Sequence, residues 1–450
     1  MSNELKPLHF DADYTMEEAL AEAKRCLNCP KPLCRMGCPI ENEIPRFIQA
    51  IAHGNFGLAN DILAERTNLP SICGRVCPRE NQCEGNCIMN KAKKPPINIG
   101  KLERFAADFE SINELRKPKK IKQDLGKVAV VGSGPAGLSV AGDIAKLGYE
   151  VTVFEGQSEP GGVLLFGIPE FRLSKSVVRR EIARLEGLGV KFVCNTFIGQ
   201  DKTLDELFAE GFDSIFIGTG THIPQEVRME NDEVHGVFQA MYLLTNVQLV
   251  DNGELNEAQI PVKKGDRVII IGGGNVAMDA ARTCVRLGCE SVTVAYRRSQ
   301  EQMPALLSEY EEARAEGVQF QWFASPVGVE GKDKVEGFKY EVMALNEDGA
   351  GIHGTGKFQV MPVDKIIIAA GHKPNARLIG EGNNLKVDEK GYIITSEDPY
   401  GMTNRDGVFA GGDVVHKPAT VVLAMREAKK AVDGMVKYME IKKAQESANQ

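Results

Sequence analysis

Cysteines are the residues whose type and spacing most clearly predict chemistry in this chain. Eight of the eleven lie between Cys26 and Cys87, in two groups. The groups read Cys26-x2-Cys29-x4-Cys34-x3-Cys38-Pro39, and Cys73-x3-Cys77-Pro78 followed by Cys83-x3-Cys87. Thiolates are soft ligands that suit iron–sulfur clusters or zinc. The remaining three (Cys194, Cys284, Cys289) are scattered among apolar neighbours, which predicts small core residues.

The spacing of the cysteines leaves two kinds of metal site open. A Cys-Pro pair that ends a short-spaced run is typical of two-cluster ferredoxins, in which the last cysteine of a run binds the other cluster. By that rule Cys26, Cys29 and Cys34 share a cluster with Cys87, and Cys38 joins Cys77 and Cys83. Two structural zinc sites of four cysteines each are the alternative. The dinucleotide motifs below favour iron–sulfur clusters, because electron carriers need a redox-active partner and zinc has no redox chemistry.

A first glycine motif follows the apolar run Lys127–Val131 and precedes an expected helix. Its first glycine permits a tight turn, its second lets a pyrophosphate approach the backbone, and its third lets the helix pack on the strand. Glu155 ends the next expected strand, where a carboxylate can accept hydrogen bonds from ribose hydroxyls. This β-α-β pattern predicts a flavin dinucleotide site. The candidate contacts are Ser133, Gly134, Pro135, Ala136, Gly137, Glu155, Gly162 in the next glycine loop, and Gly412 and Asp413 after a downstream strand.

A second glycine motif, Gly272 to Ala277, repeats the pattern after the strand-like run Arg267–Ile271. Where the first unit has an acid, this unit has Arg297 and Arg298. Arginines accommodate a 2′-phosphate by charge and bidentate hydrogen bonds, so the motif favours NADP(H) over NAD(H). A surface ion-pair network is the alternative role for the two arginines. The candidate nicotinamide-nucleotide contacts are Gly274, Asn275, Val276, Arg297, Arg298 and Gly371.

The elements that must position these residues fall into three regions of an α/β chain. A length of 450 residues suggests about three domains. We expect a helical domain with two 4Fe–4S clusters at 1–120, with helical patterns at 14–27 and 44–64. A Rossmann-like FAD-binding domain at 121–264 and 364–450 follows, with its last helix starting near Thr420. A Rossmann-like NADP(H)-binding domain at 265–363 is inserted in it.

Composition excludes several classes of protein. A net charge of -8 argues against non-specific nucleic-acid binding, so the lysines at 117–122 are interpreted as a solvated linker. No run reaches the roughly 18 apolar residues of a membrane span. The polar N-terminus lacks the apolar core of a signal peptide, so we expect a cytoplasmic protein.

Taken together, the motifs resemble those of a known family over nearly the whole chain. The chain is similar to the small (beta) subunit of glutamate synthase. Related proteins are the NADPH-binding subunit of the NADH-dependent ferredoxin:NADP oxidoreductase, the sulfide dehydrogenase subunit and the N-terminal part of dihydropyrimidine dehydrogenase. Besides the eight cysteines, the matching stretches are 96–104, 167–172, 272–279, 295–298 and 411–414.

The resemblance implies a ligand set that the spacing does not. One cluster takes four cysteines, matching Cys26, Cys29, Cys34 and Cys87. The other takes three cysteines, matching Cys38, Cys77 and Cys83, with Glu103 as its fourth ligand, and Cys73 is left as a free neighbour. An ordinary surface acid on a helix is the alternative for Glu103. The resemblance also adds Arg172 and Thr420 to the flavin contacts. The chain departs from many relatives at His416–Pro418 and at Arg426-Glu427. Either a positively charged side chain there stabilises the anionic reduced flavin, or the differences are surface variation.

The resemblance further implies a function. A hydride passes from NADPH to FAD, and single electrons then pass to the clusters, so we nominate no catalytic acid or base. The expected acceptor is a larger catalytic or electron-accepting subunit, either the glutamate synthase large subunit or a ferredoxin-linked flavoprotein, in a hetero-oligomer. The alternatives are an electron-bifurcating ferredoxin:NADP oxidoreductase subunit, a sulfide dehydrogenase subunit, and a relay module of a hydrogenase-type complex. No nucleic acid and no membrane is expected as a partner.

Overall fold

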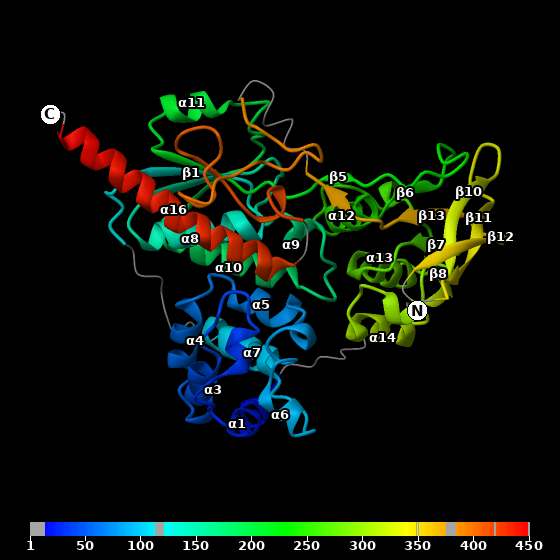
Figure 1. Cartoon of the computed structure of the whole chain (residues 1–450), viewed down its shortest axis with the longest axis horizontal. Helices are drawn as coiled ribbons and strands as arrows, with labels where there is room; N and C mark the ends of the chain where they lie inside the picture. Colours follow the sequence, from blue (N-terminus) through cyan, green and yellow to red (C-terminus); the bar gives the residue numbers. More distant parts are fainter. Residues whose placement is uncertain are drawn as a thin grey trace. The chain divides into compact units, whose positions relative to one another are not determined.

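The computed structural model describes residues 14–112, 121–347, 349, 351–374, 384–417 and 420–448 (Figure 1). Most of the expected lysine-rich linker, and Pro418 and Ala419, lie outside these residues. No helix of the described chain combines the length and the apolar composition that a bilayer crossing requires.

The first region is helical, and its described residues 14–112 contain no strand. Its elements are α1 (Met16–Lys24), α2 (Leu33–Met36), α3 (Ile44–Ala52), α4 (Phe56–Ala64), α5 (Pro70–Val76), η1 (Arg79–Asn81), α6 (Ile88–Lys91) and α7 (Ile99–Ile112). The helical pattern over 44–64 is two helices and not one. Gly54 adopts a left-handed φ of +74° after α3, and the Asn55 side chain caps α4 by accepting the Leu58 N–H. Phe47, Ile51 and Leu102 are fully buried in the core of this region.

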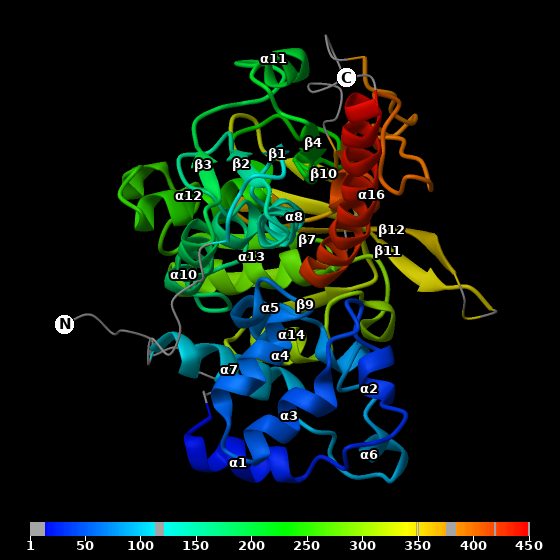
Figure 2. The same cartoon turned by 90° about the vertical axis from the view of Figure 1, so that its left-hand side faces the viewer.

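The second region contains a parallel five-stranded sheet in the order β15-β4-β1-β2-β3. The strands are β1 (Lys127–Val131), β2 (Glu150–Phe154), β3 (Lys191–Val193), β4 (Ser214–Ile217) and β15 (Val408–Ala410). The helices of this region are α8 (Pro135–Lys146), α9 (Val163–Phe166), α10 (Lys175–Gly187), α11 (Leu204–Ala209) and α16 (Val421–Ala448), with η4 (Gly412–Val414) before the last. α8 connects β1 to β2, and α16 runs alongside α8 (Figures 1 and 2). Burial of the central strands on both faces explains their unbroken apolar runs.

A second parallel sheet has the order β6-β13-β7-β8-β9. Its strands are β6 (Val237–Gln239), β7 (Arg267–Ile271), β8 (Ser291–Tyr296), β9 (Gln319–Trp322) and β13 (Lys365–Ile368). The helices around it are α12 (Ala240–Asp251), η2 (Glu257–Gln259), α13 (Asn275–Arg286), η3 (Gln300–Gln302) and α14 (Leu307–Ala315). An antiparallel three-stranded sheet follows, with β10 (Ala324–Glu330), β11 (Gly337–Leu345) and β12 (Ile352–Pro362).

The described chain divides into two compact units. One contains residues 166–171 and 224–372, and therefore the second parallel sheet. The other contains the helical region together with the first parallel sheet. The divisions fall at β5 (Ile223–Pro224) and β14 (His372–Lys373), and beside α9. The predicted fold class, a helical N-terminal region followed by two α/β nucleotide-binding folds, is confirmed.

Candidate functional site

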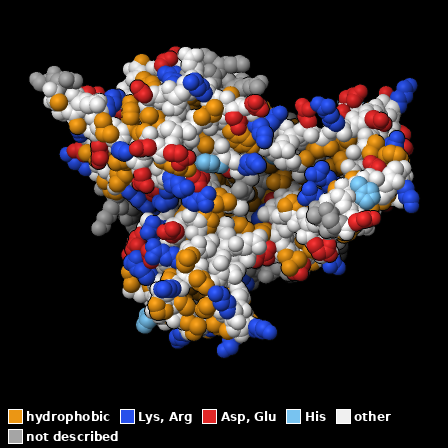
Figure 3. Space-filling model, in the orientation of Figure 1, with side chains coloured by type: hydrophobic (Ala, Val, Ile, Leu, Met, Phe, Trp, Pro, Cys, Tyr) orange, Lys and Arg blue, Asp and Glu red, His pale blue; other side chains and the backbone are white. Residues whose placement is uncertain are grey.

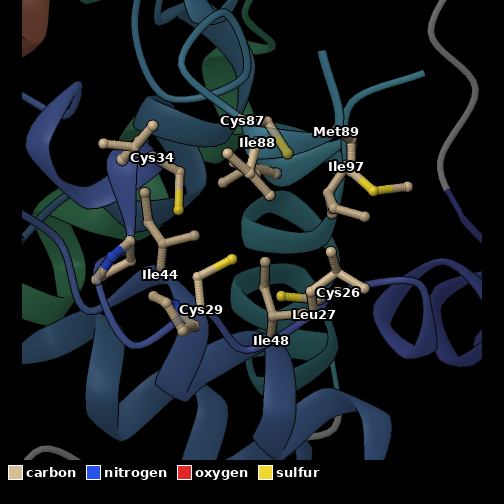
Figure 4. A pocket seen from close by; sticks show the side chains of 14 residues that line it. Cys26, Leu27, Cys29, Cys34, Ile44, Ile48, Cys87, Ile88, Met89 and Ile97 are labelled. Atoms are coloured by element: carbon tan, nitrogen blue, oxygen red, sulfur yellow. The ribbon is translucent and has the colours of Figure 1, made fainter. Parts of the chain in front are cut away.

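Four cysteines of the helical region surround one pocket. Cys26 follows α1, Cys29 lies in the next loop, Cys34 belongs to α2, and Cys87 directly precedes α6. Their sulfur atoms are directed into a shared space (Figure 4). The pocket encloses about 410 Å³, part of it open to solvent, and the rest of its lining is apolar. The lining comprises Leu27, Pro32, Leu33, Ile44, Pro45, Ile48, Ile88, Met89, Ile97 and Ile99. Four soft ligands around an apolar space fit an iron–sulfur cluster.

The surroundings of these thiols disfavour a bare negative charge. Burial raises the pKa of Cys34 to about 11, against the opposing hydrogen bond from the Arg35 backbone. Burial likewise raises the pKa of Cys26, again opposed by a backbone hydrogen bond, from Asn28. A coordinated metal ion supplies the positive charge that makes a thiolate stable in such a place.

The second predicted ligand set is also brought together. Glu103 on α7 is only 9% exposed, and its Oε1 accepts a hydrogen bond from Asn42 Nδ2 at 3.4 Å. Burial raises the pKa of Glu103 to about 8, although the charge of Arg79 opposes the shift. Burial chiefly raises the pKa of Cys38 and of Cys83, and the hydrogen bond with Cys73 chiefly raises that of Cys77. The nearby Glu103 carboxylate adds to the rise in pKa of all three cysteines, which are predicted to share its cluster. Glu103 is therefore a buried neighbour of these thiols, and the interpretation as a surface acid does not hold.

Cys73 lies beside the second set. It is buried on α5, 3.8 Å from Thr67 Oγ1, and its Sγ lies 3.7 Å from Met425 Sδ on α16. It also makes a side-chain hydrogen bond to Cys77.

In the described residues, no three His, Cys, Asp or Glu side chains are arranged to enclose a single metal ion.

The first glycine motif forms the predicted turn between β1 and α8. A Cβ on Gly137 would lie 1.9 Å from the Gly132 carbonyl oxygen, so the helix packs closely on the strand end. A Cβ on Gly132 would lie 2.8 Å from the Gly218 carbonyl oxygen. By contrast, a Cβ on Gly134 would meet no atom within 4 Å. Gly134 thus faces open space at the N-terminus of α8, where a pyrophosphate can reach the backbone.

Glu155 holds this turn together. Its carboxylate accepts hydrogen bonds from the Ser133 backbone N–H at 3.0 Å, from the Ser133 hydroxyl, and from the Gln157 N–H at 2.9 Å. Ser133 Oγ in turn accepts the Gly161 N–H at 2.8 Å. A Cβ on Gly162 would lie 2.9 Å from Gly134 Cα, so the second glycine loop packs directly on the first.

Distant segments complete the surroundings of this turn. A Cβ on Gly412, whose φ is +74°, would lie 2.7 Å from Ala136 Cβ, and Asp413 follows in η4. Thr420 Oγ1 accepts the Leu423 N–H at 3.3 Å at the start of α16. Arg172, which is partly buried, begins the next stretch of this unit. Gly218 was not predicted as part of this turn, although its position directly after the buried β4 run was an available signal.

The second glycine motif forms a similar turn between β7 and α13. A Cβ on Gly272 would lie 2.4 Å from the Ala369 carbonyl oxygen, whereas Gly274 faces open space. Asn275 Oδ1 accepts the Leu306 N–H at 3.0 Å, which orients the start of α13. The Gly371 carbonyl, after β13, accepts the Gln225 N–H at 2.9 Å. Val276 is partly buried in the first turn of α13.

Arg297 and Arg298 are exposed directly after β8. Neither forms an ion pair with any acid of the described chain. The ion-pair network of this unit is built elsewhere. Arg282, only 2% exposed, bonds to Glu312 at 2.6 Å and to Glu316 at 2.7 Å, and it lies over the Phe171 ring. The two exposed arginines therefore remain available to an anionic ligand.

The chain is similar in sequence to known proteins. The family model "Pyridine nucleotide-disulphide oxidoreductase" matches residues 126–428, and "Dihydropyrimidine dehydrogenase domain II, 4Fe-4S cluster" matches residues 6–115. The glutamate synthase (NADPH) small chain of Escherichia coli K12 is 36% identical over 94% of this chain and 92% of its own length. The NAD-dependent dihydropyrimidine dehydrogenase subunit PreT of the same organism is 34% identical over 95% of this chain and 96% of its own length.

Solved structures support the fold. A Mycobacterium tuberculosis FprA structure has a TM-score of 0.58 at 20% identity, covering 72% of this chain and 86% of that one. A Lactococcus lactis thioredoxin reductase structure has a TM-score of 0.53 at 23% identity, covering 70% of this chain and 99% of that one.

Proposed function

The chain belongs to the glutamate synthase small-chain family of oxidoreductases, and we propose that it moves electrons between NADP(H), FAD and two 4Fe–4S clusters. The observation that carries this proposal is the pocket with four converging thiols, in a region that matches a 4Fe–4S family model. In this proposal Cys26, Cys29, Cys34 and Cys87 bind one cluster. Cys38, Cys77, Cys83 and Glu103 bind the other.

The first glycine turn suits the FAD dinucleotide. The open backbone at Gly134 receives the pyrophosphate at the positive end of α8. Glu155 accepts hydrogen bonds from Ser133 and, with FAD bound, from ribose hydroxyls. Bound FAD would accept a hydride from the reduced nicotinamide and release electrons singly. The protein contributes binding and orientation, so no side chain is assigned as a general acid or base.

The second glycine turn suits NADP(H). Gly274 leaves room for the pyrophosphate, and the unpaired guanidinium groups of Arg297 and Arg298 bind the 2′-phosphate. The names of similar proteins differ on this point, since the glutamate synthase chain is named for NADPH and PreT for NAD. The exposed arginines are the reason for choosing NADP(H) here.

The electrons are passed to a larger partner subunit. The relatives named as small chains of glutamate synthase support a hetero-oligomer with a large, catalytic subunit. The cluster-binding helical region is the exit in this proposal, because iron–sulfur clusters pass on electrons singly.

The test is anaerobic reduction of the cluster- and flavin-loaded protein by NADPH. We expect flavin bleaching, iron content corresponding to two clusters, and catalytic NADPH oxidation with menadione as acceptor. Glu103→Ala should remove or alter the electron paramagnetic resonance signal of one cluster, whereas the matched change Cys73→Ala should leave both signals unchanged. The reverse pattern contradicts the ligand assignment, and zinc in place of iron contradicts the proposal as a whole.

A further inference from the structure

The surface around the four-cysteine pocket has a composition unlike that of the chain as a whole. We call residues 27–36 and 88–95 the pocket face. These two segments meet at the pocket, which is lined by Leu27, Pro32 and Leu33 from one and by Ile88 and Met89 from the other. The two segments are far apart in the sequence, and the fold brings them together at the pocket.

The pocket face is basic. It contains five basic residues and no acid, in a chain whose net charge is -8. Arg35 is paired with Glu43 at 2.8 Å. The other four are exposed and form no ion pair with the described residues. They are Lys31, Lys91, Lys93 and Lys94. In Figure 3 the lower end of the helical region, where Figure 1 shows α6, carries blue side chains among orange ones.

The nearest acid in the sequence does not neutralise these lysines. Glu84 precedes the pocket face, but its Oε1 is turned inward and accepts the Gly100 N–H at 2.9 Å. An unbalanced group of positive charges produces a local potential that attracts an acidic partner and speeds its association.

Apolar side chains lie among the lysines. Met36 is 75% exposed and Leu27 is 64% exposed, the highest values among the large hydrophobic residues of the described chain. Leu27 lines the pocket, and Met36 follows the pocket cysteine Cys34 by two residues, so both supply exposed apolar surface on the pocket face. Interfaces between electron-transfer proteins are typically small, so a patch of this kind is sufficient.

The pocket face is held in a defined conformation. Arg25 Nη2 donates a hydrogen bond to the Pro95 carbonyl at 2.6 Å, which ties the end of the face to α1. The Lys94 N–H bonds to the Met89 carbonyl at 3.0 Å, so the lysine turn folds back on the pocket lining. A partner therefore meets a preformed surface, which lowers the entropic cost of binding.

We propose that the pocket face is the docking surface for an acidic, one-electron-accepting protein. The proposal rests on the proposed function, because it requires that the four-cysteine pocket holds a cluster. It adds which of the two clusters delivers electrons outward, and the chemistry of the surface that receives them. Lysines steer the partner, and Leu27 and Met36 pack against it near the pocket mouth.

The test uses the loaded protein, NADPH and an acidic plant-type ferredoxin as the probe acceptor. The variant is K31E/K93E/K94E. The matched control reverses the same number of exposed lysines elsewhere, as K386E/K390E/K443E. We expect the pocket-face variant to reduce ferredoxin at least roughly tenfold more slowly at low salt, with a correspondingly weaker dissociation constant by calorimetry. In the wild type, raising salt from about 20 mM to about 200 mM should slow the reaction similarly.

Other acceptors separate this proposal from the function it rests on. NADPH oxidation with menadione, a small neutral quinone, should be equal in wild type, variant and control. Reduction of the basic protein cytochrome c should not fall in the variant. Ferredoxin reduction within twofold of wild type in the variant, or an equal loss in the control, overturns the docking proposal. Absence of menadione reduction by the wild type overturns the proposed function instead.

Discussion

The two glycine turns of this chain share a strand–turn–helix arrangement, but the residues that follow their second strands carry opposite charges. In both, the first strand pairs in parallel with the second over five residues, and a crossover helix begins directly after a glycine, Gly134 or Gly274. In the first turn the position after β2 is Glu155, buried and bonded to Ser133. In the second it is Arg297, exposed and without an acid partner in the described chain.

The comparison indicates that the glycines shape the turn, whereas the residue after the second strand selects the ligand. The close-packed glycines at the turn are needed for the strand and helix to approach, whatever dinucleotide binds. The residue after the second strand differs between the two turns, buried Glu155 in one and exposed Arg297 in the other, so its charge can match a ribose hydroxyl or a phosphate. The same turn can therefore serve two cofactors on one chain.

The largest expected effect is on folding. Gly137→Ala would place a methyl group 1.9 Å from the Gly132 carbonyl oxygen, so the helix start must shift away from β1. We expect the free energy of unfolding of the flavin-free protein to fall by about 3 kcal/mol. Urea denaturation measures this loss. Gly134→Ala is the matched control, because its methyl group meets no atom within 4 Å and its φ of -69° suits alanine.

An unchanged urea midpoint for Gly137→Ala would mean that the turn is not closely packed. The glycines would then not be what shapes the turn. Gly134→Ala should instead lose flavin affinity while keeping its stability, since the added methyl group occupies the approach of the pyrophosphate.

The next effect is loss of flavin from the first turn. Glu155→Gln replaces a carboxylate that accepts three hydrogen bonds with an amide whose NH2 group must face a donor. We expect FAD affinity to fall roughly tenfold to hundredfold. Flavin fluorescence titration of the apoprotein measures it. NADPH affinity, which depends on the other turn, should stay the same, and a parallel loss there would contradict the separation of the two sites.

A more selective effect is expected at the second turn. Arg297→Ala with Arg298→Ala removes the charge-assisted hydrogen bonds to the 2′-phosphate, worth about 1.5–3 kcal/mol. The KM for NADPH should rise roughly tenfold to hundredfold. The KM for NADH should be unchanged, because NADH lacks that phosphate. Equal increases for both nucleotides would show that the arginines support the fold and do not select the cofactor.

The smallest effect is the response to salt. Exposed charges are screened, so raising salt from about 20 mM to about 200 mM should increase the KM for NADPH by roughly two- to fivefold. The increase should disappear in the double arginine variant and should be absent for NADH. Steady-state kinetics with menadione tests this. A salt effect that persists in the variant would mean that other residues contact the 2′-phosphate.

Sequence patterns were sufficient for the fold class and for the local turns. The strands Lys127–Val131 and Arg267–Ile271 are where their apolar runs place them, since a buried parallel strand needs an unbroken apolar sequence. The family resemblance is confirmed by the comparisons. The grouping of cysteines follows ligand spacing, and the structure brings the first group around one pocket.

Long-range contacts could not be predicted from local patterns. Nothing in the periodicity indicates that Gly412 lies on Ala136, or that Gly218 closes the turn at Gly132. The single helical pattern over 44–64 also gave no weight to Gly54 as a helix end. Cys194 and Cys289 were expected in the core but are only partly buried, because each lies at the margin of its sheet or helix.

The contact between Cys73 and Met425 has a consequence for how the protein is made. The two residues are 352 positions apart, yet their sulfur atoms meet beside the second ligand set. During synthesis the cysteine-rich helices emerge early, whereas α16 emerges only after both sheets. The surroundings of the second ligand set are therefore completed late in translation. On the proposed function, a cluster bound early at this set would be without its α16 neighbour until the last part of the chain is made.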